Sequence, residues 1–391
     1  MKDKKTYYIV SGLNLNDNNR GTAALGYGSF LFLKNFYNTN DLTVIRLFLY
    51  KKPWRFNFKG SSDEVINIDL EERVIRTFYI WFVDYWIYKN IPFLSRLTKI
   101  YRILKKVSFV AAINGGDGFS DIYNTKTFEG RLFDINLAMK EQIPLILLPQ
   151  TLGPFKEKNN FDTAAKILKY SSKIYVRDLK FESELIKMKL DYELTKDLSF
   201  YMVPEKFDID IKPNAVGLNV SGLCYSNRFK GLTGYFDYYP QLIDRIITYF
   251  QDKNVPLYLV SHSYNYKCPE NANDDMQAAR EAYSRLTDKS NAYLIDKDLT
   301  SPQIKYVISQ FDFFIGTRMH SNFAAIFTNV PVFGLAYSYK YEGSFNYMGL
   351  KGYYASVLNL EKEDIDDVLF QIAEKYKNIE SYPFAGYRYN K

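Results

Sequence analysis

Cysteine and histidine are scarce in this chain of 391 residues, which contains two of each. Two cysteines are too few for a disulfide framework, so we expect a reducing compartment. The same scarcity argues against a structural zinc site. The N-terminus, MKDKKTYYIVSGLNLND, has no apolar stretch long enough for a signal peptide. We therefore expect a cytoplasmic protein.

Long runs of one charge are also absent. The chain has 51 basic and 44 acidic residues and a net charge of +7, which suits an anionic small substrate or an acidic lipid surface. It has no zinc-finger spacing or RNA-binding signature, so we expect no nucleic-acid partner. Aromatic residues, in contrast, are abundant, with 35 Tyr and 30 Phe. Core packing and genome composition explain them, or some tyrosines line a sugar-binding cleft or a membrane-facing surface.

Short aliphatic runs alternate with amphipathic segments, a pattern typical of parallel sheets covered by helices. The runs of the first half are YYIVSGLN, LTVIRLFLY, VSFVAAINGG, IPLILLPQTLG and KIYVRD. The rhythm restarts after Pro204 with AVGLNVSG, VPLYLVSHS, NAYLID, FDFFIGTRMH and VPVFGLAYS. We therefore expect an α/β protein of two Rossmann-like domains that face a cleft, residues 1–205 and 206–391, joined through the polar stretch MVPEKFDIDIKPN.

Residues 78–107, FYIWFVDYWIYKNIPFLSRLTKIYRILKKV, interrupt this pattern. The first part is apolar and aromatic, but it contains Asp84 and is too short to span a bilayer. The second part carries basic residues at three- and four-residue spacing, namely Arg96, Lys99, Arg102 and Lys106. Two interpretations stay open: an amphipathic segment that anchors the protein at a membrane interface, or two helices packed on the first sheet with a solvated basic face.

Polar and glycine residues that follow the predicted strands are the candidates for a site, because ligands of open α/β sheets bind beyond the carboxyl ends of the strands. In NNRGTAALGYGSF, Gly21 allows close approach of a ligand to the start of a helix, or simply makes a tight turn. In AAINGGDGFSD, glycines around Asp117 suit an anion or a sugar. Asp117 and Asp121 accept a hydroxyl proton there, or cap a helix.

Two further strand ends carry charged residues. Arg177 in KIYVRD offers the two-pronged geometry that matches a carboxylate or a phosphate, while Asp178 suits a helix cap. His262 also follows a strand, and the acidic pair Asp274-Asp275 comes after it. This pair lacks the DxD pattern of metal-dependent sugar transferases, so we expect it to cap a helix and complement the helix dipole.

The stretch FFIGTRMHSNFAAIF places Arg318 and His320 between an apolar strand and a helix. An anion at this turn meets unpaired N–H groups and the positive helix end as well as both side chains. The alternative is an incidental surface arginine and histidine. We expect Met319, between them, to pack inward and hold the turn.

Taken in order, NGGDGFSD, PQTLGPF, YVRD, KDLSF and GTRMHSNFAAIFTNVPVFGLAYSYK resemble the polysaccharide pyruvyltransferase family, over about Asn14 to Lys340. The resemblance implies a fold similar to type B glycosyltransferases. It implies transfer of a pyruvyl group from phosphoenolpyruvate to a sugar hydroxyl pair as a ketal. It also implies that the first domain binds the acceptor and the second binds the donor, with no metal or redox cofactor.

The resemblance also assigns roles. The donor-binding residues are Arg318, His320 and Arg177, with Met319 where the family has leucine. Gln150 is a further candidate for a donor contact, and its assignment stays open. The chemistry of the reaction, rather than the resemblance, leads us to expect two catalytic residues: His320, as acid or phosphate ligand, and Asp117, as base. The residues that we place on the acceptor side are Asn19, Arg20, Gly21, Gly116 and Asp121. The first loop has Thr22 where an acidic residue is expected after the glycine.

Two other functions stay open at this point. One is a type B glycosyltransferase that uses a nucleotide sugar, although no base-stacking pocket or ribose-binding acid stands out. The other is a non-enzymatic assembly protein at the membrane. For the pyruvyltransferase we expect three partners: phosphoenolpyruvate, a sugar or glycolipid acceptor, and peripheral contact with an anionic membrane at its inner face.

Overall fold

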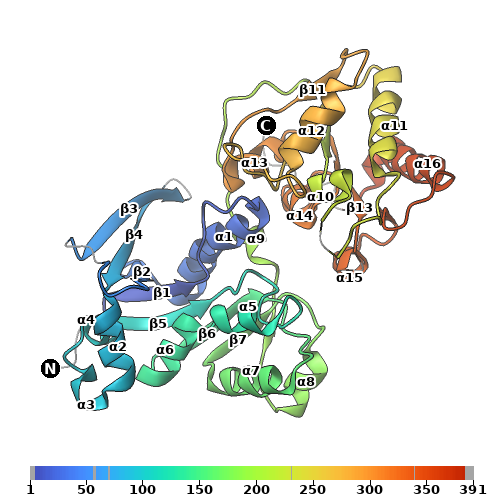
Figure 1. Cartoon of the computed structure of the whole chain (residues 1–391). Coiled ribbons are helices and arrows are strands. Elements are labelled where there is room, and N and C mark those ends of the chain that lie inside the picture. The colour runs from blue at the N-terminus through green and yellow to red at the C-terminus, as the bar shows by residue number, and fades with distance from the viewer. Residues whose placement is uncertain (1–4, 56–58, 69–70, 230, 339, 384–391) are drawn as a thin grey trace. The chain divides into compact units, whose positions relative to one another are not determined.

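The computed structural model describes residues 5–55, 59–68, 71–229, 231–338 and 340–383 (Figure 1). The chain forms two compact units, Met1–Asn14 with Leu25–Val203 (unit 1) and Leu15–Ala24 with Pro204–Lys391 (unit 2). The division near residue 203 lies close to the predicted boundary. Residues 15–24, which we had placed in the first domain, belong instead to unit 2, because they hydrogen-bond to its loops: Arg20 N donates to His262 O at 3.1 Å.

Unit 1 is built on an eight-stranded sheet in the order β3-β4-β2-β1-β5-β6-β7-β8, in which only the β3–β4 pair is antiparallel. The central strands β5 and β6 are buried along almost their whole length, which explains their continuous apolar sequences. The strands are β1 (Tyr7–Ser11), β2 (Thr43–Leu49), β3 (Ser61–Ile68), β4 (Glu71–Ile80), β5 (Val107–Ala112), β6 (Leu145–Gln150), β7 (Lys173–Val176) and β8 (Glu193–Leu194).

Helices connect these parallel strands and bury an apolar side against the sheet, as in α7, where Ala164, Ile167 and Leu168 are buried. The helix α1 (Arg20–Tyr37) starts in the segment that belongs to unit 2 and continues into unit 1. The other helices of unit 1 are α2 (Phe82–Asn90), α3 (Pro92–Ser95), α4 (Lys99–Leu104), α5 (Thr125–Gly130), α6 (Phe133–Glu141), α7 (Lys158–Tyr170), α8 (Glu182–Lys187) and α9 (Leu198–Tyr201).

The segment 78–107 folds as the end of β4 followed by three short helices. Pro92 starts α3, and Thr98 caps α4 by accepting from Tyr101 N. Asp84 also caps α4, because its carboxylate accepts from Lys99 N at 2.8 Å and from Ile100 N at 3.1 Å. The four basic residues therefore do not lie on one continuous helix. Among the described residues, no helix has the length and apolar character needed to cross a membrane.

Unit 2 is built on a six-stranded parallel sheet in the order β11-β10-β9-β12-β13-β14. Its strands are β9 (Val216–Asn219), β10 (Leu257–Val260), β11 (Ala292–Leu294), β12 (Phe313–Gly316), β13 (Val332–Ala336) and β14 (Tyr354–Ser356). Its helices are α10 (Gly222–Ser226), α11 (Tyr239–Asp252), α12 (Asp275–Ser284), α13 (Ser301–Ser309), α14 (Met319–Phe327), α15 (Lys340–Tyr347), α16 (Asp364–Lys377) and the 3-10 turn η1 (Ile379–Ser381).

The register of the three central strands of unit 2 positions the site. Asn219, at the end of β9, pairs with Val260 of β10 on one side and with Gly316 of β12 on the other. Because these strands are parallel and end at the same level, the loops that follow them leave from one edge of the sheet. These loops contain the residues around Gly222, His262 and Arg318.

Candidate functional site

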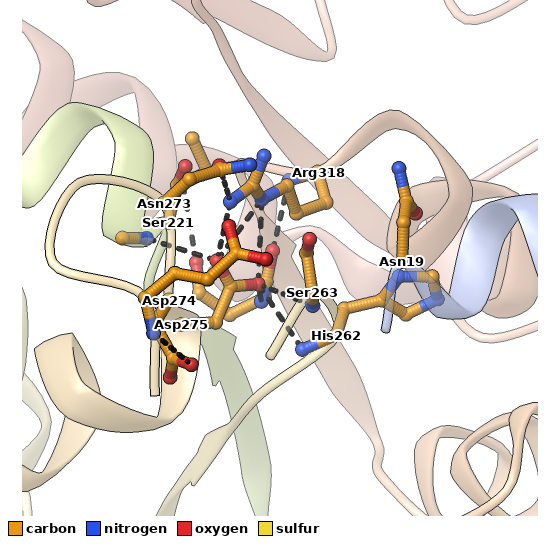
Figure 2. Close-up of polar contacts among 12 residues, drawn as sticks. Asn19, Ser221, His262, Ser263, Asn273, Asp274, Asp275 and Arg318 are labelled. Carbon is orange, nitrogen blue, oxygen red and sulfur yellow. Dashed lines mark hydrogen bonds and ion pairs between the residues drawn. The ribbon is translucent and has the colours of Figure 1, made fainter. Parts of the chain in front are cut away.

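A single buried carboxylate links the three loops at this edge. Asp275 is fully buried and accepts from Gly222 N at 2.9 Å, His262 N at 3.1 Å and Ser263 N at 2.9 Å. Asn219 Nδ2 donates to it from the end of β9 at 3.3 Å. Figure 2 shows His262 and Ser263 beside this carboxylate. A buried charge needs such partners, because each hydrogen bond offsets part of the cost of its desolvation.

The strongest partner of Asp275 is Arg318. Nε and Nη2 of Arg318 donate to Oδ1 of Asp275 at 3.0 and 2.7 Å (Figure 2). Nη2 also donates to Asn273 Oδ1 at 2.6 Å, and the Arg318 backbone N donates to Asn219 Oδ1 at 2.8 Å. Burial alone would lower the pKa of Arg318, but the charge of Asp275 raises this pKa above its ordinary value. Arg318 is therefore charged and held in one orientation.

Arg318 precedes the first residue of α14, so the predicted strand, turn and helix at this position are confirmed. Two hydrogen bonds of Thr317 stabilise the turn: its hydroxyl donates to Asn219 O at 3.1 Å, and its carbonyl oxygen accepts from the Tyr341 hydroxyl. Met319 is partly buried and packs against the apolar core on this side of the sheet. The turn thus presents the positive end of a nine-residue helix beside Arg318.

The two histidines of the chain both belong to this part of unit 2. The ring of His320 lies against Gly21, since a Cβ at residue 21 would be 2.6 Å from Nδ1. His262 is buried, and its pKa lies well below its ordinary value because of burial and the nearby positive charges of His320, Arg318 and Arg20. His262 is therefore neutral at neutral pH. The sequence marked His262 only as a residue at a strand end.

Asn19, Arg20 and Gly21, which we predicted on the acceptor side, lie at the start of α1 in unit 2. Asn19 forms a β-bridge with Ser263, so the segment is bound directly to the loop after β10. The Arg20 guanidinium donates to Leu299 O at 2.8 Å, Asp17 O at 2.6 Å and Asp298 Oδ1 at 3.0 Å. All three nitrogens of Arg20 thus have protein acceptors, which gives this residue an anchoring role in the fold.

Arg177 and Gly116 lie together in unit 1. Arg177 donates from Nη1 to Asp197 Oδ2 at 2.7 Å and from Nε to the Thr151 hydroxyl at 3.0 Å. Gly116 has φ +84°, and a Cβ there would lie 3.0 Å from Arg177 Nη1. Asp117, next in the chain, accepts from the Tyr123 hydroxyl at 3.0 Å. These strand-end residues of unit 1 thus lie near one another, and the roles that the sequence suggested for them stay predictions.

Gln150 and Asp121 have their polar atoms engaged by the protein. Gln150 is fully buried, donates to Ala112 O at 2.9 Å and accepts from Asn114 Nδ2 at 3.2 Å. The Asp121 carboxylate accepts from the backbone N–H groups of residues 156 and 157 and from Asn160 Nδ2 at 3.0 Å. These contacts stabilise the loops after β5 and β6, and they leave the predicted donor and acceptor roles without direct support.

Asp134, which the sequence did not single out, lies near the end of β1. Its carboxyl hydrogen-bonds with Ser11, the last residue of β1, and burial raises its pKa to about 6. This end of β1 is where the sheet order reverses, with β2 on one side and β5 on the other. A helical carboxylate of this kind has no local sequence signal, because its burial depends on a strand more than a hundred residues away.

Solved structures with a similar fold extend over nearly the whole chain. A putative UDP-N-acetylglucosamine 2-epimerase from Listeria monocytogenes has 11% identity and a TM-score of 0.55, covering 97% of this chain and 92% of that chain. Another UDP-N-acetylglucosamine 2-epimerase has 14% identity and a TM-score of 0.50, covering 98% of this chain and 92% of that chain. At such identities the likeness concerns the fold, and it confirms the predicted pair of parallel-sheet domains of the type B glycosyltransferase kind.

The sequence comparison is more specific about function. The family described as polysaccharide pyruvyl transferase matches residues 19–339, which is more than half of the chain. The match includes both Arg318 and His320, as well as the strand-end loops of unit 1. The chain therefore belongs to the polysaccharide pyruvyl transferase family, and it is a transferase with a role in polysaccharide pyruvylation.

Proposed function

We propose that the protein transfers the pyruvyl group of phosphoenolpyruvate to two hydroxyls of one sugar, which forms a cyclic ketal and releases phosphate. The acceptor that we propose is a lipid-linked precursor of a surface polysaccharide at the cytoplasmic face of the membrane. One observation carries the donor part of the proposal. Arg318 and His320 flank the N-terminus of α14, at the carboxyl edge of the unit 2 sheet.

Phosphoenolpyruvate suits this position because it carries a carboxylate and a phosphate on only three carbons. Such a donor needs two anion-binding groups close together. The start of α14 provides N–H groups and the positive end of the helix dipole. Asp275 offsets the charge of Arg318, so the pair adds little net positive charge to the site. The contribution of Arg318 to donor binding is therefore mainly a set of hydrogen-bond donors in a fixed orientation. The helix end and the His320 side chain supply the remaining attraction.

The reaction begins when a proton adds to the methylene carbon of the donor, which becomes a methyl group and leaves a cationic centre at the carbon that bears the phosphate oxygen. One sugar hydroxyl attacks this carbon and loses its proton to a base. The carbon–oxygen bond to phosphate then breaks, and the second hydroxyl closes the ketal. The two hydroxyl protons balance the proton taken up by the methyl group and the one carried by phosphate. We assign the acid or phosphate-binding role to His320 and the base to Asp117.

The test is to incubate the full chain with labelled phosphoenolpyruvate and a glycolipid acceptor, measuring phosphate release and pyruvylated product. Arg318→Ala and His320→Ala should each lower kcat/KM, His320→Ala by about 10²–10⁴-fold if it transfers a proton. Arg280→Ala is the control, because Arg280 also forms an arginine–aspartate ion pair, with Asp296 and with Nε at 3.0 Å, but this pair is more exposed and lies outside the site. Release of nucleotide from nucleotide sugars, without phosphate release from phosphoenolpyruvate, would support the glycosyltransferase instead.

The membrane part of the proposal concerns α2, α3 and the turn after α3. Apolar side chains on this segment are unusually exposed, with 49% exposure for Trp86, 79% for Phe93 and 72% for Leu97. Lys89 and Arg96 are exposed beside them in the sequence. Exposed aromatic and aliphatic side chains next to basic ones suit the interface of an anionic bilayer. Lys99 is one of the four basic residues that we expected to face the membrane. Its Nζ donates to Gly60 O at 2.7 Å and to Tyr79 O at 2.9 Å, so this side chain stabilises the fold instead.

Vesicle sedimentation tests this part separately. Replacing Phe93 and Leu97 with Ser should weaken binding to phosphatidylglycerol vesicles by at least about tenfold, because both apolar side chains would be buried in the interface. Arg96→Gln should weaken it about fivefold, and only with anionic lipid. Phe370→Ser is the control, since Phe370 is 65% exposed on α16 of the other unit. Equal binding by all variants would contradict membrane contact through this segment.

A further inference from the structure

Two adjacent aspartates of unit 2 have different partners. Asp274 caps α12, because its carboxylate accepts from Gln277 N at 3.0 Å, Asn265 N at 3.0 Å and Glu270 N at 3.3 Å. Asp275 points the other way, toward Arg318 and the loops after β9 and β10 (Figure 2). Both are buried, with 3% and 0% exposure. Only one of the two carboxylates therefore contacts the candidate donor site.

The contact with Asp275 fixes the direction of the Arg318 side chain. Nε and Nη2 form one edge of the planar guanidinium, and both donate to Asp275 Oδ1. Asn273 Oδ1 accepts from Nη2 as well, at 2.6 Å. A planar group held along one edge cannot rotate, so the position of Nη1 at the other side is determined. Nη1 lies outside the ion pair with Asp275.

Breaking this pair has a large expected effect. Arg318 and Asp275 are almost completely buried, with side-chain exposures of 10% and 0%. Removing one partner of a buried pair leaves the other charge without compensation, which is more costly than loss of an exposed pair. Arg318 then moves toward water or toward another acceptor. In either case the guanidinium loses the orientation that Asp275 gives it.

We infer that Asp275 is a positioning residue of the donor site, which holds Arg318 in the orientation that binds phosphoenolpyruvate and ties the loops after β9 and β10 to it. This inference rests on the proposed function, since it names what orients the donor-binding arginine. Asp275 does not touch the donor or the reacting atoms. It acts through Arg318, through the side chain of Asn219 and through the backbone of Gly222, His262 and Ser263.

The experiment compares Asp275→Asn with Asp274→Asn in the full chain. Asp275→Asn should raise the KM and the calorimetric Kd for phosphoenolpyruvate by about 10- to 100-fold, because misplacement of a binding group by about 1 Å has effects of this size. The KM for the acceptor should change less than about twofold. Asp274→Asn should lower the unfolding midpoint but leave the KM for phosphoenolpyruvate within about twofold. A purely structural role of Asp275 would make the two variants alike.

Each outcome decides the inference. A folded Asp275→Asn variant with unchanged KM and Kd for phosphoenolpyruvate, or an equal rise in Asp274→Asn, overturns it. If Asp275→Asn does not fold, Asn273→Ala decides, because it removes one contact to Nη2 and keeps the buried charge pair. It should raise the Kd for phosphoenolpyruvate at least about threefold, and an unchanged Kd overturns the inference. A wild-type chain that neither binds nor uses phosphoenolpyruvate overturns the proposed function, and the assignment with it.

Discussion

Gly21→Ala is a small change with a large expected effect on the candidate site. An added Cβ would lie 2.6 Å from Nδ1 of His320, 2.7 Å from its Cγ and 2.8 Å from its Cβ. Carbon atoms in contact are normally about 3.5–4.0 Å apart, so His320 must move by about 1 Å. Rotation of the ring alone does not relieve the overlap, because the His320 Cβ is bound directly to the backbone of α14.

Two opposing terms set the stability of this variant. Alanine in a helix is better than glycine by up to about 1 kcal/mol, and residue 21 lies in the first turn of α1. Overpacking costs about 1–3 kcal/mol. The free energy of unfolding should therefore be unchanged or fall by at most about 3 kcal/mol. Displacement of His320 by about 1 Å should lower kcat for pyruvyl transfer by about 10²-fold.

Urea unfolding and phosphate release measure the two effects. Gly343→Ala is the matched control, because Gly343 is also helical, in α15, and an added Cβ meets no atom within 4 Å. The control should be more stable by up to about 1 kcal/mol and fully active. If Gly21→Ala gains the same stability and keeps full activity, then His320 does not pack against residue 21, and our view of the site is refuted.

Three further predictions concern single groups. Burial raises the folded-state pKa of Asp134 to about 6 from an ordinary 3.8, so the contribution of this group to stability falls as the pH rises from 4 to 6, by at most about 3 kcal/mol. The free energy of unfolding of Asp134→Asn in urea should therefore depend less on pH between 4 and 6. Asp121 has a lowered pKa, because hydrogen bonds from Asn160 and two backbone N–H groups outweigh its burial. Asp121→Ala should therefore lower the free energy of unfolding by about 1–3 kcal/mol at pH 7, and an equal loss of stability at low pH would contradict this cause. Burial raises the pKa of the Cys224 thiol to about 12, whereas Cys268 is exposed, so a thiol reagent should titrate one group in the native protein and two in denaturant.

Much of unit 2 could be predicted locally. The runs ending in Asn219, Val260 and Gly316 are apolar, and each becomes a buried parallel strand. The Arg318–His320 turn was predicted because strand, polar turn and helix follow each other directly in the chain. The helix cap assigned to the acidic pair is confirmed for Asp274. These features depend on interactions between residues near each other in the sequence.

The antiparallel pair β3–β4 was not predicted. The residues of its sequences, SSDEVINI and EERVIRTFYI, are mostly exposed or half-buried, and they alternate only weakly between polar and apolar types. An edge hairpin of this kind buries little apolar surface, so its periodicity is faint. The end of β4 was instead assigned to the segment 78–107, whose aromatic residues resemble a helix pattern.

The sequence by itself determined the alternation of strands and helices, the division into two α/β domains and the turn between strand and helix at Arg318, because each rests on local periodicity or on neighbouring residues. Only the tertiary structure decided that Asp275, 43 residues away from Arg318, orients its guanidinium. It also decided that Gly21 packs against His320, and that residues 15–24 belong to unit 2. The physical reason is that hydrogen bonds and close contacts of buried groups form between segments that the chain brings together only on folding.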